Sequence, residues 1–170
     1  MIYAILPEEL QKFANARKDA QGLALSLVDL TDGDVSTASL AALVSKNRSS
    51  ILTVSDGVAH IKISGVLQKE HDFWSMLFGG ATIYGDIRSA IDAANADESV
   101  SEIVLHIDSP GGEVDGVYET DMAIKKSAKK ITARVEGMAA SAAYWLASQA
   151  SEIVASSPTD YVGSIGVVAE

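Results

Sequence analysis

The chain has 170 residues, a formal net charge of −10 and no cysteine. This length suits one domain with a sizeable core, and a hydrophobic content of 48% excludes a disordered chain. The lack of cysteine excludes thiol catalysis and disulfides, and the acidic balance argues against nucleic acid as a partner. No apolar run reaches the length of a membrane span, and residues 1–10 lack a signal-peptide pattern. We therefore expect a cytoplasmic protein without a membrane span.

Residues 1–50 are predicted to be a helical appendage followed by a linker. Pro7-Glu8-Glu9 is a typical helix start, because proline suits the first turn and acids suit the positive end of a helix. No residue of this segment suggests chemistry. The remainder, 51–170, is predicted to be the functional domain.

The pattern that follows predicts a hairpin and a helix. Ile51–Ser55 and Val58–Leu67 are predicted strands, and Asp56-Gly57 between them is typical of a tight hairpin turn. The apolar stretch Phe73–Phe78 predicts a packing surface between subunits, with a substrate groove as the alternative. Apolar residues then recur at helical spacing over 82–96, which predicts an amphipathic helix.

From residue 100 onward, strands and helices alternate. Ser101–Ile107 is almost continuously apolar, as in a parallel strand covered on both faces, and Ile131–Val135 is the next predicted strand. Glu113–Lys130 between them predicts a helix, with acids in its first turn and lysines in its last. Further strands are predicted at Ile153–Ala155 and Val162–Val168. This alternation predicts an α/β fold of βαβ units with a largely parallel sheet.

Two predicted strand ends carry the candidate chemistry, because ligands of open α/β sheets bind at the carboxyl ends of strands. At the second end, Ser141 lies between alanines at the start of a helix, where it could act as a nucleophile. At the first end, Gly112 could donate its N–H to an oxyanion together with the N–H of Ala142, and whether Gly111 shares this task is left open. Taken singly, the Pro110-Gly111-Gly112 turn and a serine in an alanine-rich helix are common structural features. Their occurrence at successive strand ends favours an active site.

Three motifs resemble the signal peptide peptidase A family of serine peptidases. They are Ile107-Asp108-Ser109-Pro110-Gly111-Gly112, Ala139-Ala140-Ser141-Ala142-Ala143-Tyr144-Trp145 and Val162-Gly163-Ser164-Ile165-Gly166-Val167. The resemblance runs from about Gly57 to the end of the chain, and it implies the Clp protease/crotonase fold of repeated ββα and βαβ units. Much of the family carries Gly-Gly where this chain has Ala142-Ala143, a departure that leaves the nucleophile in place. The helical start and the missing membrane anchor resemble the tailed-phage prohead protease branch.

A serine nucleophile needs a neighbouring base. The histidines of the chain all precede Ser141, and a strand histidine such as His106 is more typically satisfied within the fold. The resemblance implies a Ser–Lys dyad whose lysine lies after Glu170, whereas the lysines of Lys125–Lys130 are interpreted as surface charge at a helix end. The carboxylates that follow the serine are weak bases: Glu152, Asp160 and Glu170. We therefore expect a peptidase domain that is incomplete at its C-terminus and inactive by itself.

The resemblance implies a serine endopeptidase that acts on proteins or peptides without a metal or a cofactor. The phage branch implies capsid, portal or scaffold proteins as partners and a setting in the host cytoplasm or the prohead. We expect a homo-oligomer, from Phe73–Phe78 and from the family's habit of forming rings. The alternatives are a bacterial signal-peptide-degrading peptidase, a non-catalytic assembly component of the same fold, and a crotonase-like acyl-thioester enzyme. The serine counts against the last of these, and the missing base keeps the second open.

Overall fold

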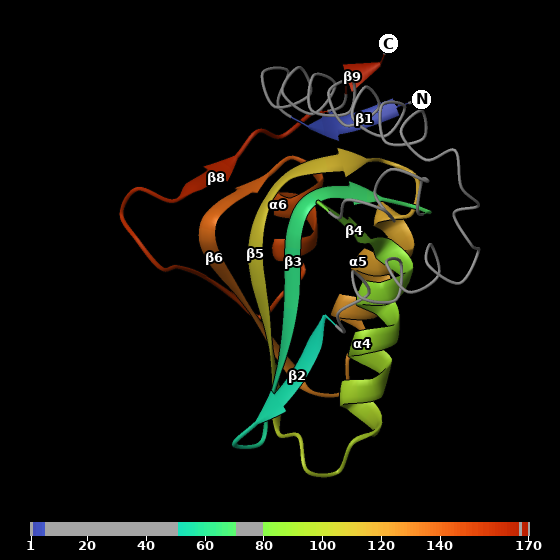
Figure 1. Ribbon diagram of the computed structural model, residues 1–170, viewed down its shortest axis with the longest axis vertical. Coiled ribbons are helices and arrows are strands. Elements are labelled where there is room, and N and C mark those ends of the chain that lie inside the picture. Colours follow the sequence, from blue (N-terminus) through green and yellow to red (C-terminus); the bar gives the residue numbers. More distant parts are fainter. Residues whose placement is uncertain (1, 6–50, 71–79, 167, 170) are drawn as a thin grey trace, which may run out of the picture.

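The computed structural model describes residues 2–5, 51–70, 80–166 and 168–169. Within these residues the chain forms one mixed sheet with helices packed on one of its faces (Figure 1). The strands are β1 (Ile2–Ile5), β2 (Leu52–Ser55), β3 (Val58–Gln68), β4 (Ala81–Ile83), β5 (Glu102–Glu113), β6 (Lys130–Ala140), β7 (Glu152–Ala155), β8 (Tyr161–Gly163) and β9 (Val168–Ala169). The helices are α4 (Tyr84–Ala96), α5 (Val117–Lys125) and α6 (Ala142–Ala147).

The centre of the sheet is parallel, as the alternation of strands and helices predicts. β3 pairs with β5, β5 with β6, and β6 with both β7 and β8, all in parallel. β2 joins β3 as an antiparallel hairpin, and both turn residues, Asp56 and Gly57, have positive φ angles of 51° and 78°. This conformation is the one that favours Asp-Gly in two-residue hairpins, and it confirms the predicted turn.

The core lies between the sheet and the helices. The side chains of β3 and β5 alternate, so that Ile61, Ile63, Leu105 and Ile107 point to the helices and are fully buried. They pack in one cluster with the apolar faces of α4, α5 and α6. Each such side chain contributes about 1.5–3 kcal/mol through burial. The opposite face of these strands carries polar side chains and no helix from the described part of the chain (Figure 1).

Two predicted boundaries between Ser101 and Lys130 are wrong. β5 continues through the Pro-Gly-Gly segment to Glu113, because its last residues pair with β3 on one side and with β1 on the other. The predicted helix Glu113–Lys130 is only α5, because it starts after Gly116, whose left-handed φ of 101° cannot continue a helix backwards.

Other predicted elements differ in smaller ways. The predicted strand Val162–Val168 is interrupted at residues 164–166, where Ser164 has a φ of 55°. β6 extends beyond the predicted Ile131–Val135 to Ala140. The short strand β4 before α4 was not predicted.

The N-terminal segment lies largely outside the described residues. Residues 2–5 form β1, which pairs antiparallel with the end of β5 and with β9, so that this strand lies beside β9 in Figure 1. The predicted helix that begins near Pro7 and the apolar stretch Phe73–Phe78 both lie outside the described residues. The domain boundary at residue 50 therefore stays a prediction.

Candidate active site

Ser141 is the residue at which β6 turns into α6. Its φ of 54° and ψ of −118° are unusual for a residue with a side chain, and such conformations occur most often at functional sites. The first helical hydrogen bond follows at once, from the N–H of Trp145 to the carbonyl of Ser141, at 2.9 Å. The sharp turn therefore lies at the serine itself and not at the glycine four residues before it, Gly137. Gly137 has a φ of 117° but lies within β6.

The end of β8 and the residues that follow it hold Ser141 in place. The N–H of Ser141 donates to the carbonyl of Gly163 at 2.9 Å, and its hydroxyl donates to the carbonyl of Gly166 at 3.3 Å. β8 reaches this position because it pairs with the end of β6, with Ala140 opposite Gly163. The residues that resemble the third family motif thus lie directly against the residues of the second.

The alanines around Ser141 are all fully buried. Ala139 and Ala140 end β6, and Ala142 and Ala143 begin α6, which packs on β5 and β6. Larger side chains at these positions would prevent this close packing. The small residues that the sequence shows around the serine are therefore required by the fold, whatever the chemistry of the site.

A pocket of about 300 Å³ opens at Ser141. The described residues that line it are Ser141, Tyr144, Trp145, Ser148, Ile165 and Gly166. Trp145 and Ile165 remain exposed there, although both are large and apolar. The serine itself is 5% exposed. Its hydroxyl therefore lies at the wall of a pocket that suits an apolar side chain.

Gly112 occupies a place in β5 that only glycine can fill. A Cβ atom at this position would overlap the carbonyl oxygen of Leu67 in β3, its neighbour across the sheet. Next to the candidate site, Ser109 lies opposite Ala139 of β6, so the Pro-Gly-Gly segment continues β5 beside the end of β6. Neither Gly111 nor Gly112 is among the described residues that line the pocket.

Ser109 organises this segment, and no pattern in the sequence indicates this role. Its side chain is fully buried, and its hydroxyl donates to the carbonyl of Gly65 at 2.6 Å. The same hydroxyl accepts the N–H of Gly111 at 3.2 Å. The amide of Gly111 is thus already bonded, while Gly112 lies between Leu67 of β3 and Ala4 of β1.

The described histidines and lysines do not line the pocket at Ser141. His106 bonds to His60 and Glu136 on the polar face of the sheet, which makes it a partly exposed residue and not a core histidine. The amine of Lys129 donates to the carbonyl of Ala94 at 2.6 Å, so this lysine binds at the end of α4 and not at the end of its own helix, which stops at Lys125. No histidine, lysine or carboxylate is found among the described residues that line the pocket at Ser141.

Known proteins that resemble this chain are peptidases and phage assembly proteins. The sequence model of peptidase family S49 matches residues 123–170. Protease 4 of Salmonella typhi is 40% identical over 92 residues, which cover 52% of this chain and 14% of that protein. The head-tail preconnector protein GP5 of Enterobacteria phage P21 is 34% identical over 126 residues, which cover 72% of this chain and 25% of that protein. Capsid assembly protease C of Escherichia phage lambda is 31% identical over 153 residues, which cover 84% of this chain and 34% of that protein. The chain thus spans about a third or less of the length of these relatives.

Solved structures confirm the predicted fold. An enoyl-CoA hydratase from Polaromonas sp. JS666 superposes with a TM-score of 0.52, covering 65% of this chain and 49% of that one at 19% identity. At this identity the likeness shows the fold alone, which is the crotonase-like arrangement that the sequence predicted.

In the described part of the chain, no helix has the length and apolar character needed to cross a bilayer. The family match adds to this fold a likeness to peptidase family S49 over residues 123–170, which include Ser141.

Proposed function

We propose that this chain carries the nucleophile of a serine endopeptidase. The observation that carries the proposal is the backbone of Ser141, which has a φ of 54° at a strand-to-helix turn and places the serine at the wall of a pocket. Strain of this kind costs on the order of 1–3 kcal/mol and persists only where the surrounding structure enforces it. Here a purely packing serine would need no such conformation.

In the proposed reaction the oxygen of Ser141 attacks the carbonyl carbon of a peptide bond, and its proton passes to a base. The N–H of Ala142, which precedes the helical bonding pattern, and the N–H of Gly112 would stabilise the oxyanion. Loss of one such donor typically costs about 100- to 1,000-fold in rate. We propose a lysine outside the described residues as the base, as the family resemblance implies.

The substrates are proposed to be proteins of a viral capsid assembly. The support is the similarity to a capsid assembly protease of phage lambda and to a head-tail preconnector protein of phage P21. Portal or scaffold proteins are further candidates, in the host cytoplasm or in the prohead. The pocket beside the serine would accept an apolar side chain next to the cleaved bond.

Labelling with a fluorophosphonate probe tests the nucleophile. In the full-length protein we expect the probe to label one serine, and Ser141→Ala to abolish labelling without loss of the fold. Ser148→Ala is the matched control, because Ser148 lines the same pocket and donates its hydroxyl to the carbonyl of Trp145. Labelling that survives Ser141→Ala, or that disappears in Ser148→Ala, would contradict the assignment.

A non-catalytic assembly component is the second candidate function. The observation in its favour is that the hydroxyl of Ser141 donates to the carbonyl of Gly166, while no described base lines the pocket. The same experiment separates the two functions. A folded full-length protein that is neither labelled by the probe nor able to cleave capsid proteins would support this second candidate.

A further inference from the structure

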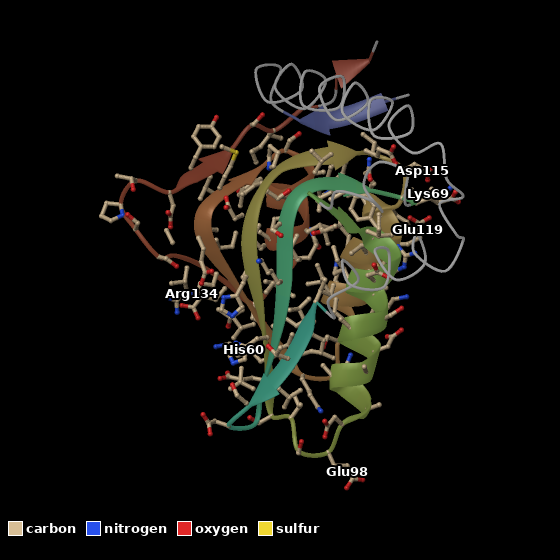
Figure 2. All side chains as sticks on the ribbon, viewed as in Figure 1. His60, Lys69, Glu98, Asp115, Glu119 and Arg134 are labelled. Carbon is tan, nitrogen blue, oxygen red and sulfur yellow. The ribbon has the colours of Figure 1, made fainter. Side chains whose placement is uncertain are left out.

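The polar face of the sheet carries a second cluster of polar and charged side chains. None of them is among the described residues that line the pocket at Ser141. The cluster consists of His60 on β3, His106 on β5, and Arg134 and Glu136 on β6. These residues belong to adjacent strands and point away from the helices, as the labelled side chains of His60 and Arg134 show in Figure 2. The proposed peptidase chemistry uses none of them.

The two histidines are held as a pair. Nδ1 of His60 lies 2.9 Å from Nε2 of His106, and Nδ1 of His106 lies 2.8 Å from Oε1 of Glu136. Since a carboxylate accepts hydrogen bonds, His106 carries its proton on Nδ1, which leaves the lone pair of Nε2 directed at His60. A carboxylate on the far nitrogen of an imidazole is the arrangement that orients histidine ligands in metal sites. Arg134, at 3.1 Å from the same carboxylate oxygen, holds Glu136 in turn.

Both rings face an open pocket of about 400 Å³. Its wall also contains oxygen-bearing side chains from four strands, and the described lining residues are Ile51, Thr53, His60, Lys62, Ile63, Ser64, His106, Asp108 and Glu136. An ion with its water shell can therefore reach the two facing nitrogens. The formal charge of −10 on the chain favours a cation over an anion.

We propose that His60 and His106 bind a divalent transition-metal ion such as Ni²⁺ or Cu²⁺, because imidazole nitrogen is a suitable ligand for both ions. The separation of 2.9 Å between the two nitrogens is that of a hydrogen bond, so the rings have to turn before both lone pairs face one ion.

Binding requires only a change of tautomer and a rotation of the rings. In the metal-free pair His60 donates its Nδ1 proton to Nε2 of His106. For both nitrogens to bind a metal, neutral His60 moves this proton to its own Nε2, and the two lone pairs turn toward the pocket. The number of protons is unchanged. No group of three or more His, Asp, Glu or Cys residues in the described ranges is placed to hold an ion, so water completes the coordination.

Titration of the protein with NiCl₂, followed by calorimetry, tests the site. We expect one saturable equivalent of Ni²⁺, and a loss of affinity of at least about tenfold in His60→Gln and in His106→Gln. Glu136→Gln should weaken binding by about 10- to 100-fold, since partners of ligating histidines contribute this much. His71→Gln is the matched control, as the third histidine of the chain, and it should bind as the unsubstituted protein does.

A second measurement guards against variants that fail to fold. Paramagnetic Ni²⁺ should broaden the amide signals near residues 60 and 106 in the unsubstituted protein, and leave those near Ser141 sharp. Three results would overturn the proposal: no saturable binding, unchanged binding in the folded double variant His60→Gln/His106→Gln, or broadening that centres elsewhere.

Discussion

At the scale of single residues, the backbone of Ser141 is the feature that most clearly separates a functional interpretation from a structural one. An ordinary helix cap has extended backbone and needs no positive φ. Ser141 instead has a φ of 54° and a ψ of −118°, held by its N–H bond to Gly163 and by the start of α6. The surrounding structure therefore enforces a conformation that serine by itself disfavours.

This strain predicts the stability of two variants at position 141. Both Ser141→Ala and Ser141→Gly remove the hydroxyl bond to Gly166, but only glycine relieves the positive φ. Glycine should relieve about 1–3 kcal/mol of backbone strain. Its greater freedom in the unfolded chain costs about 0.5–1 kcal/mol. Ser141→Gly should therefore be about 1 kcal/mol more stable than Ser141→Ala. Urea unfolding measures the difference. Equal stabilities would show that the position is unstrained, and Ala140→Gly in β6, which should destabilise, is the control.

The sequence could indicate Ser141 and the glycine pair, because their residue types are visible in the motifs. It could not indicate Ser109, whose role depends on a hydroxyl that bridges Gly65 and Gly111. It also could not pair His60 with His106, because 46 residues separate them and only the register of β3 and β5 brings them together.

At the scale of elements, α5 contains an acid in an apolar setting. Asp121 is 8% exposed and faces the packed side of the helix, and its Oδ1 has no hydrogen-bond partner in the described part of the structure. Burial raises the pKa of this carboxyl from 3.8 to about 7, because the charged form loses its hydration.

The raised pKa predicts how stability changes with pH. Between about pH 4 and pH 7 the folded chain holds the Asp121 proton while the unfolded chain has released it, so the free energy of unfolding falls as the pH rises. Asp121→Asn should remove this slope and be more stable than the unsubstituted protein at pH 8, on the order of 2–4 kcal/mol, with little difference at pH 4. Chemical unfolding at the two pH values measures this. Asp92→Asn, at an exposed position of α4, should change neither value, and an unchanged slope in Asp121→Asn would refute the assignment.

The elements were predicted well where periodicity carries the signal and poorly where tertiary pairing overrides it. The hairpin of β2 and β3, helix α4 and the parallel order of β5 and β6 follow from alternation and helical spacing. The extension of β5 does not, because the Pro-Gly-Gly segment becomes a strand only through its partners on both sides, and one of these is β1 from the start of the chain.

At the scale of the whole molecule, the two candidate sites lie at different parts of the sheet. Ser141 and its pocket lie at the junction of β6 with α6, whereas the histidine pair lies on the polar face that the described helices leave uncovered. Both depend on β5, which carries His106 near its middle and Gly112 near its end. Loss of strand pairing at β5 should therefore begin near the candidate oxyanion segment, because one of the two strands paired there, β1, has only four residues.

The pairing of β1 with β5 leads to the last prediction. Tyr3, Ala4 and Ile5 lie opposite Glu113, Gly112 and Gly111, and β9 flanks β1 on its other side. Deletion of residues 2–5 should expose this edge of β5, so that hydrogen exchange of the amides at 111–113 becomes faster by an order of magnitude or more. The amides at 103–107, which lie between β3 and β6, are the internal control and should keep their protection. Mass spectrometry of exchanged peptides measures both segments, and equal protection of 111–113 with and without residues 2–5 would show that β1 does not support this edge in solution.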